Sequence, residues 1–360
     1  MNSDTDLGLR KQSRYARQSR LPEIGEAGQR RLQEATVAVV GVGALGSVAA
    51  ELLCRSGIGR LLLIDRDCVE LSNLHRQSLY TEADAAEGML KAKAAARRLG
   101  EINGEVQVVP RALELSGTNA PGLLEDADLI IDGTDNLYSR YAINDAALEL
   151  GVPWVHGAAT ATYGVVLSFM PGGKPCFRCY APPQEGGEAG GCAVTGVLPA
   201  TTHIVAARQV AEGMKILLTG EATGGMIYID PWYTVEQRME VPPRIDCPRC
   251  GEAADGEAAE GEAAAGGSGT KLPMNSEPPK YEELCGDDTI RVRPEGEKSV
   301  PLDALGDGLP ADSIVSSAEG VLRFRAEETE VTLFGDGRAL IRGAGSRERA
   351  RHIYTEYVGA

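Results

Sequence analysis

Short apolar segments alternate with longer stretches of helical character through the first half of the chain. Five of these segments carry an unbroken hydrophobic run: TVAVVG (36–41), RLLLID (60–65), VQVVP (106–110), ADLIIDG (127–133) and PWVHG (153–157). Strands of this kind are buried on both faces, and their alternation with helices is typical of βαβ units. The pattern predicts an α/β fold, a Rossmann-like parallel sheet with helices on both faces.

The pattern changes in the second half of the chain. YGVVLSFM (163–170) and GMIYID (225–230) indicate later strands, partly antiparallel, and residues 198–218 have the pattern of a long amphipathic helix. Residues 251–279 are rich in glycine, alanine and acid, which is typical of a flexible linker. Residues 280–360 contain a few strand-like segments, a Gly-Asp-Gly turn and a terminal helical stretch. We therefore expect a main domain over 1–250, an acidic linker over 251–279, and a small C-terminal α+β appendage with a docking or stabilising role.

Composition narrows the function classes. The 360 residues carry a formal net charge of −16, whereas a general nucleic-acid binder needs a basic face. No segment approaches the roughly 18 apolar residues of a membrane-spanning helix, and the first residues lack an apolar signal core. We expect a cytoplasmic protein that binds neither nucleic acid nor membrane.

The first apolar segment runs into a dinucleotide-binding fingerprint. Gly41, Gly43 and Gly46 spell G-x-G-x-x-G, and Asp65 ends the second apolar segment. Gly41 permits the tight turn, Gly43 lets phosphate approach the backbone, and Gly46 lets the helix pack close to the strand. Asp65 can accept hydrogen bonds from ribose hydroxyls. A structural glycine turn without a ligand is the alternative, and the fingerprint alone does not separate NAD from ATP.

The segment after Asp65 favours a triphosphate. Asn73, Arg76 and Gln77 follow within twelve residues, and Lys91 lies early on a predicted helix. Two cations and two amides suit a group whose transition state carries charge on phosphate oxygens. Composition alone also allows a solvated helix and a salt-bridged loop.

Two C-x-x-C pairs indicate a metal site. Cys176 and Cys179 form one pair, and Cys247 and Cys250 form the other. Four thiolates make a closed tetrahedral site without an open position for water, so we predict structural zinc. A redox role for one pair is the alternative.

Several motifs in one order carry a family resemblance. RYARQ (14–18), VVGVGALGS, IDRDCVELSNLHRQ, GMLKAKAA, IDGTDN and the two C-x-x-C pairs resemble the ubiquitin-activating-enzyme superfamily, in particular its bacterial MoeB and ThiF adenylyltransferases. The resemblance covers residues 14 to about 250. It implies that ATP and magnesium activate the C-terminal Gly-Gly carboxylate of a small ubiquitin-like sulfur-carrier protein as an acyl-adenylate. The carrier would serve molybdopterin or thiamine biosynthesis, and the enzyme would be a homodimer.

The resemblance also assigns the residues of the nucleotide site. It implies that Asp65 binds the ribose and that Arg76 is lent across the dimer as an arginine finger. It places the following residues at the phosphates: Arg17, Asn73, Arg76, Gln77 and Lys91.

Asp135 is the essential acid by the same resemblance. It follows a predicted strand, at the edge of the sheet where parallel sheets bind ligands, and is suited to hold magnesium. Asn136 would support it, and Asp67 and Asp132 could share its role or cap helices. A simple helix N-cap is the alternative for Asp135.

Sulfur transfer leaves further alternatives open. Cys192 aligns with a cysteine that some relatives use to attach their carrier, which would make this a ubiquitin-activation-like enzyme with a covalent intermediate. Residues 280–360 are too few for a rhodanese domain, so we expect a separate sulfur donor, either a cysteine desulfurase or a rhodanese. A function of another class, that of an NAD-binding redox or sensory module, is supported only by the glycine fingerprint and Asp65. The acidic composition disfavours the related branch that adenylates a tRNA base.

Overall fold

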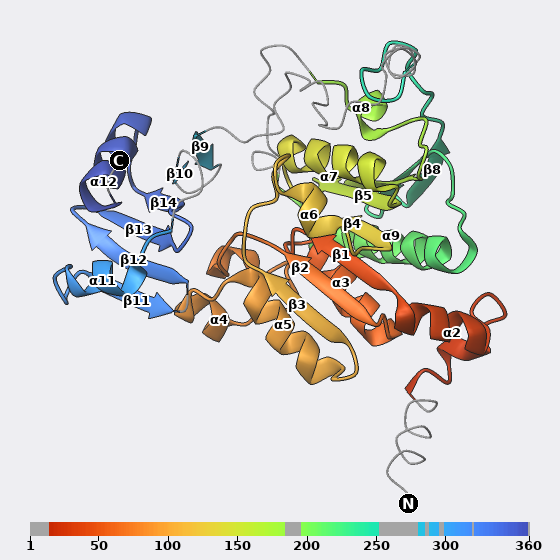
Figure 1. The fold of residues 1–360 in the computed structure, drawn as a ribbon, viewed down its shortest axis with the longest axis horizontal. Helices are drawn as coiled ribbons and strands as arrows, with labels where there is room; N and C mark the ends of the chain where they lie inside the picture. The colour runs from red at the N-terminus through yellow and green to blue at the C-terminus, as the bar shows by residue number, and fades with distance from the viewer. Residues whose placement is uncertain are drawn as a thin grey trace, which may run out of the picture.

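Two β-sheets organise the molecule in the computed structural model (Figure 1). The structure describes residues 14–183, 196–251, 280–284, 288–294, 299–318 and 320–358. The predicted linker lies almost entirely outside the described residues. No helix among the described residues is long and apolar enough to cross a membrane.

The first sheet has eight strands in the order β3-β2-β1-β4-β5-β6-β7-β8. Its first five strands are parallel, and the last three continue it antiparallel. This confirms the predicted fold, because each of the five apolar segments forms one of the parallel strands. In sheet order the strands are β3 (Gln107–Arg111), β2 (Arg60–Ile64), β1 (Thr36–Val40), β4 (Leu129–Asp132), β5 (Trp154–Thr160), β6 (Tyr163–Phe169), β7 (Met226–Asp230) and β8 (Val235–Met239).

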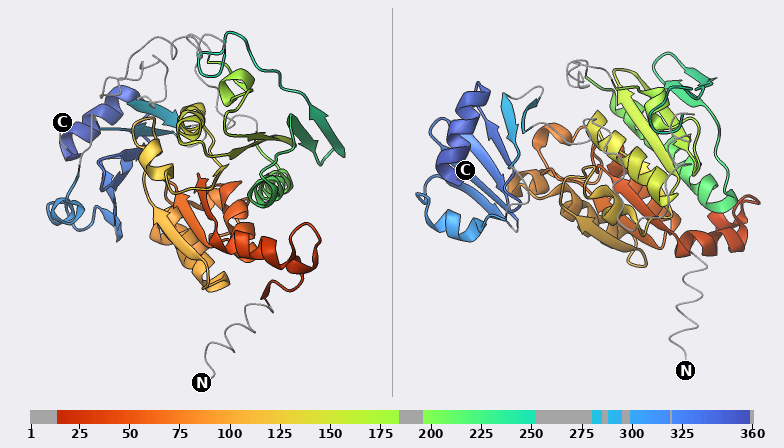
Figure 2. Two further views of the ribbon diagram at one scale, coloured as in Figure 1. Left: turned by 45° about the vertical axis from the view of Figure 1, so that its right-hand side comes forward. Right: turned by 45° about the horizontal axis from the view of Figure 1, so that its top comes forward.

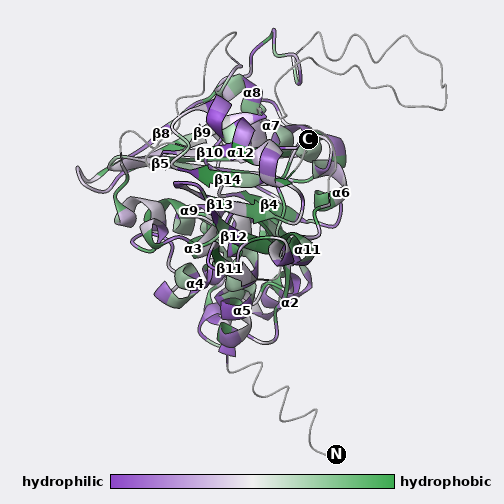
Figure 3. Cartoon of the chain, turned by 90° about the vertical axis from the view of Figure 1, so that its left-hand side faces the viewer, coloured by the Kyte–Doolittle hydropathy of each residue, from purple (hydrophilic) through white to green (hydrophobic). Residues whose placement is uncertain are grey.

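Helices cover both faces of this sheet. Alternate residues of β1 show the two sides, since Val37 and Val39 pack against α2, α3, α5 and α9, whereas Ala38 and Val40 pack against α6 and α7. In Figure 3 the central strand β4 is green, while purple stretches lie on the surrounding helices. The helices of this part are η1 (Gln18–Arg20), α2 (Gly25–Glu34), α3 (Gly46–Ser56), η2 (Leu71–Asn73), α4 (Glu82–Glu87), α5 (Lys91–Ile102), α6 (Ala120–Leu124), α7 (Leu137–Leu150), α8 (Phe177–Tyr180) and α9 (Pro199–Thr219).

The second sheet belongs to the C-terminal unit, by which we mean the described residues from 280 to 358. Its six strands run antiparallel in the order β11-β12-β13-β14-β10-β9, and α12 packs on it through the buried Ile353. The predicted hairpin turn joins β13 to β14, and the predicted terminal helix is α12. The elements are β9 (Tyr281–Leu284), β10 (Thr289–Val292), α11 (Leu302–Asp307), β11 (Ile314–Ala318), β12 (Val321–Ala326), β13 (Thr329–Phe334), β14 (Ala339–Arg342) and α12 (Arg347–Val358).

The C-terminal unit packs against the edge of the first sheet where the parallel strands end. Figure 2 shows it, in blue, beside the orange segment that follows β2. A small apolar cluster fills the contact, with Cys68 and Leu90 from the first part and Val321 and Phe334 from the second. Cys68, to which the sequence assigns no role, therefore lies buried in this contact.

Candidate functional site

The glycine turn between β1 and α3 has the geometry that its sequence predicts. Gly41 adopts a φ of +80°, which favours glycine. A Cβ on Gly46 would lie 1.8 Å from the Gly41 carbonyl oxygen, so the start of α3 packs directly against the turn. A Cβ on Gly43 would meet nothing nearer than Gln77 Nε2 at 3.8 Å. Packing within the chain therefore explains two of these glycines, and the space in front of the third is open to a ligand.

A third backbone joins this contact. A Cβ on Gly133 would lie 2.5 Å from the Gly41 oxygen and 2.8 Å from the Gly46 nitrogen. The turn after β4, which carries Asp135, is thus packed backbone to backbone against the turn after β1. Sequence analysis included Gly133 in a motif but gave it no role.

Asp65 lies beside the glycine turn and is buried. Its two carboxylate oxygens accept hydrogen bonds from the backbone N–H groups of Val42, at 2.6 Å, and of Asp67, at 2.7 Å. Burial raises the pKa of Asp65, against the opposing effect of nearby Lys91. These bonds hold the carboxylate at the carboxyl end of β2, the position that a ribose contact requires.

Asp67 and Lys91 form an ion pair next to it. Lys91 Nζ lies 3.5 Å from Asp67 Oδ2, and only 9% of the lysine side chain is exposed. Burial lowers the pKa of Lys91, but Asp67, Asp65 and Asp135 outweigh that effect, and the pKa ends raised. The site therefore holds a buried and charged ammonium group within the field of three carboxylates.

Asn73 and Gln77 lie on the turn that begins at η2, and both are buried. The side-chain oxygen of Gln77 is buried without a hydrogen-bond partner among the described residues. The atom of this amide nearest the open side of Gly43 is the nitrogen Nε2, a hydrogen-bond donor that fits a phosphate oxygen. The unpartnered oxygen only accepts hydrogen bonds, so it fits a donor such as a ribose hydroxyl and not the phosphate itself.

The two predicted arginines differ in position, since Arg76 lies on the same turn as Asn73 and Gln77, whereas Arg17 lies at the far end of α3. Arg76 Nη1 donates to the Ser72 carbonyl oxygen at 3.1 Å and so lies against its own turn. Arg17 is exposed, and Gln18 beside it donates to the carbonyl oxygen of Ser56, the last residue of α3. The glycine turn lies at the other end of α3, about 16 Å away at 1.5 Å per helical residue.

Asp135 and Asn136, in the turn after β4, have different structural roles. Asn136, not Asp135, is the N-cap of α7, since its side-chain oxygen accepts from the Ser139 N–H at 2.9 Å. The N-cap alternative for Asp135 is therefore wrong. Asp135 is exposed, and Asn136 Nδ2 lies 3.4 Å from its Oδ1, while the supporting role expected for Asn136 stays a prediction.

Asp132 belongs to a buried network rather than to the exposed edge. It accepts hydrogen bonds from the N–H and the hydroxyl of Thr134, and its Oδ2 lies 2.7 Å from His156 Nδ1. Arg140 donates to the Thr134 carbonyl oxygen at 2.6 Å. The network fixes the turn from within, and its fully buried acid is poorly placed to share a magnesium ion with Asp135. Sequence analysis missed this pairing, because no local pattern joins Asp132 to His156.

The four cysteines of the C-x-x-C pairs come together and are buried. Their sulfur atoms lie within 4.8 Å of one another, with 3.6 Å between Cys176 and Cys247 and 3.4 Å between Cys179 and Cys250. These distances are too long for disulfides. They are close to the spacing of about 3.8 Å that follows from a tetrahedral site with Zn–S bonds of about 2.3 Å. The four thiols fit a structural zinc ion, and the described residues contain no other group of this kind.

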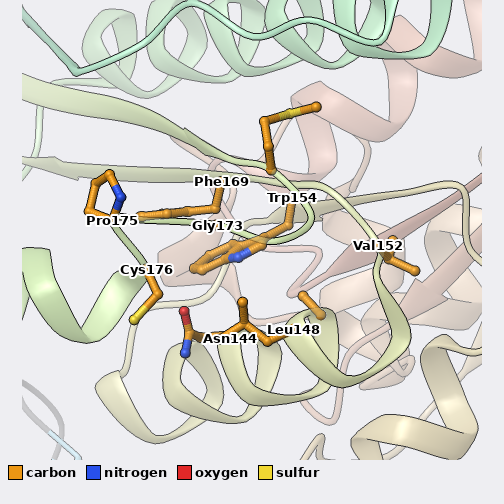
Figure 4. Close-up of a pocket in the computed structure, with 10 residues that line it drawn as sticks. Asn144, Leu148, Val152, Trp154, Phe169, Gly173, Pro175 and Cys176 are labelled. Atoms are coloured by element: carbon orange, nitrogen blue, oxygen red, sulfur yellow. The ribbon is translucent and has the colours of Figure 1, made fainter. Parts of the chain in front are cut away.

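Aromatic packing supports this cysteine cluster. Figure 4 shows Cys176 beside Trp154 and Phe169, with Asn144 facing it from α7. Asn144 accepts a hydrogen bond from the Phe177 N–H at 2.8 Å, which anchors the first C-x-x-C pair to α7. The cavity between these residues has a volume of only about 10 Å³, room for about one water molecule. It is a packing defect rather than a ligand site. Cys192, the predicted carrier-attachment thiol, lies outside the described residues.

Known proteins place this site in a family. The ThiF family matches residues 15–249. Sulfur carrier protein ThiS adenylyltransferase of Bacillus subtilis (strain 168) is 35% identical over 352 residues, which cover 96% of this chain and 99% of that protein. Sulfur carrier protein adenylyltransferase of Thermus thermophilus is 38% identical over 247 residues, covering 66% of this chain and 90% of that protein.

Among solved structures, E. coli MccB shares the fold with a TM-score of 0.57 at 22% identity, over 67% of this chain and 72% of that one. The glycine turn, Lys91 and the acids after β2 and β4 all lie within the residues that the family matches, so the resemblance seen in the motifs is confirmed: this chain belongs to the ThiF family.

Proposed function

We propose that this chain is an ATP-dependent adenylyltransferase that activates the C-terminal glycine carboxylate of a ubiquitin-like sulfur-carrier protein. The observation that carries the proposal is the buried Lys91, set among Asp65, Asp67 and Asp135 beside an open glycine turn. The ThiF family match and the names of both relatives support it. Because these relatives are adenylyltransferases, we favour ATP over the NAD-binding alternative.

In the proposed reaction, a carboxylate oxygen of the carrier attacks the α-phosphorus of ATP. The bond from that phosphorus to the bridging oxygen breaks, and pyrophosphate leaves with the electron pair. The N–H groups at the start of α3 face the phosphates, Lys91, Asn73 and Gln77 bind them, and Asp65 orients the ribose. A bound magnesium ion would neutralise charge on the phosphate oxygens, with the exposed Asp135 as the residue to hold it.

A second copy of the chain completes the site in this proposal. Arg17 lies about the length of α3 away from its own glycine turn, and Arg76 lies against its own loop. Arg17 could reach phosphates only by a large rearrangement or from a partner subunit, whereas Arg76 would have to turn away from Ser72 to bind a phosphate of either subunit. We therefore infer a homodimer in which each subunit lends these arginines to the other.

The carrier is proposed to be of the ThiS type. The similarity to the Bacillus subtilis protein runs over 96% of this chain and so includes the C-terminal unit. The similarity to the Thermus thermophilus protein spans 66% of the chain. A thiamine-pathway carrier is therefore favoured over a molybdopterin-pathway carrier, with sulfur supplied by a separate cysteine desulfurase or rhodanese.

Carrier-dependent exchange of pyrophosphate into ATP tests the proposal. The full chain is assayed with magnesium and with a ThiS-type carrier, a MoaD-type carrier, or a ThiS-type carrier without its last glycine. We expect exchange with the intact ThiS-type carrier, none with the truncated one, and a loss of at least about a hundredfold in Asp135→Asn. Absence of exchange with every folded carrier, together with tight NAD binding, would refute the proposal. In the same assay, Cys192→Ser should leave exchange unchanged, because the thiol would act after adenylation.

A further inference from the structure

Ion pairs join the C-terminal unit to the edge of the sheet that carries the nucleotide site. Arg291 Nη2 in β10 lies 3.3 Å from Asp67 Oδ1, although 224 residues separate them in the chain. Arg293 donates to Glu114 at 2.8 and 3.0 Å, and Arg66 pairs with the same carboxylate. The C-terminal unit therefore contacts Asp67 itself, the acid that also forms the ion pair with Lys91.

Cations are concentrated around Asp67. Burial raises the pKa of Asp67, but Lys91, Arg291, Arg66 and Arg338 outweigh it and hold that pKa well below its usual range. Burial and the nearby Arg291 lower the pKa of Arg66 to about 9. Such crowding of positive charge stands out in a chain with a formal net charge of −16. It suits a ligand that brings several negative charges to this edge.

Asp67 also competes with such a ligand. Lys91 lies against Asp67 Oδ2, so binding to a phosphate would weaken or replace this pair. A partly buried carboxylate that loses its cation is costly unless another cation remains. Arg291 contacts the other oxygen, Oδ1, and its backbone pairs with β14 and β9, which fixes it in the sheet. Arg66 Nε also lies 3.6 Å from Oδ1, but the same guanidinium group pairs with Glu114. Arg291 can therefore be the main cation that keeps Asp67 neutralised while Lys91 turns to the ligand.

We propose that Arg291 is a positioning residue of the nucleotide site, which balances the charge of Asp67 from the C-terminal unit and leaves Lys91 available to the triphosphate. This inference rests on the proposed function. It gives the C-terminal unit a part in ATP binding, beyond the docking or stabilising role expected from the sequence.

Variants of the full chain test this role. ATP affinity is measured by calorimetry, and KM and kcat by pyrophosphate exchange, for Arg291→Ala, Arg291→Lys and the control Arg325→Ala. Arg325 lies in the same sheet, on β12, but is exposed. We expect Arg291→Ala to raise the Kd and KM for ATP roughly tenfold, as for loss of a charge-assisted hydrogen bond, with kcat changed less than about twofold. Arg291→Lys should restore most of the affinity, and Arg325→Ala should match the unmodified chain.

A double-mutant cycle with Asp67→Asn identifies the path of the effect. If Arg291 acts through Asp67, Arg291→Ala changes ATP affinity less than about twofold in the Asp67→Asn background. An equal loss in both backgrounds, or unchanged ATP affinity in Arg291→Ala, overturns the inference while leaving the proposed function intact. An unmodified chain that binds no ATP refutes the proposed function and this inference with it. Melting temperatures verify folding, and Arg291→Gln replaces Arg291→Ala if the latter does not fold.

Discussion

Alanine substitutions at two glycines of the same turn should affect different properties: Gly46→Ala should reduce stability, and Gly43→Ala should reduce ATP affinity. In Gly46→Ala the new Cβ would lie 1.8 Å from the Gly41 carbonyl oxygen, more than 1 Å inside the closest approach of 3.0 Å that such atoms make. The new Cβ is attached rigidly to the backbone of α3, and the oxygen belongs to the backbone of the turn, so the clash is relieved only if α3 moves. We expect a loss of about 3 kcal/mol or more from overpacking, which exceeds the gain of about 1 kcal/mol from the better helix propensity of alanine.

Gly43→Ala provides the matched comparison. Its Cβ would have Gln77 Nε2 at 3.8 Å as its nearest neighbour, an ordinary contact. The free energy of unfolding should change by no more than about 0.5 kcal/mol. ATP affinity should decrease at least about tenfold, or 1.4 kcal/mol, because the methyl group occupies the space that the phosphates need.

Thermal melting and calorimetric ATP titration separate the two effects. Gly46→Ala should melt roughly 6–12 °C lower, at about 2–4 °C per kcal/mol for a domain of this size, and Gly43→Ala should melt like the unmodified chain. If Gly43→Ala binds ATP normally, the phosphates do not approach this glycine. If both variants lose the same stability, the backbone contact assigned to Gly46 is not special and the reasoning is refuted.

Three further changes test other parts of the structure. We expect elemental analysis to find one zinc ion per unmodified chain and none in Cys247→Ser, whereas Cys54→Ala, at a buried cysteine outside the cluster, should retain it. Asn136→Ala removes the N-cap of α7 and should cost about 1 kcal/mol in urea unfolding, while Asn136→Asp keeps the cap and most of the stability. Burial lowers the pKa of His156 despite its bond to Asp132, so the unfolded chain binds a proton that the folded chain does not. The free energy of unfolding should therefore fall as the pH drops from 7.5 to 5.5, by up to about 1.4 kcal/mol per pH unit, and His156→Asn should reduce this slope.

The sequence predicts the parallel sheet well because its central strands β1, β2 and β4 are buried on both faces and consist of apolar runs. β8 shows where this signal ends. Its residues, VEQRM, are mostly exposed and have no hydrophobic pattern, and the strand forms through its pairing with β7. An edge strand of this kind depends on its neighbour rather than on its own side chains, so local sequence does not reveal it.

Within the site, too, the parts set by local sequence can be predicted, and the parts set by tertiary contacts cannot. The glycine turn and Asp65 lie within one βαβ unit, where the fixed geometry of strand, turn and helix ties sequence spacing to position. The contact of Arg291 with Asp67 spans 224 residues and joins two sheets. Neither residue has a neighbour in sequence that signals the other. Long-range ion pairs such as this one follow from tertiary packing alone.

The contact among Gly41, Gly46 and Gly133 has a consequence for how the two halves of the site operate. With three main chains touching and no side chain between them, the loop proposed to receive the nucleotide and the loop that carries Asp135 are packed together as one block. Neither loop can swing open without displacing the other. Substrate capture and placement of the acid would then be a single event, and adjustment during turnover would fall to the arriving carrier tail and to the arginines outside the block.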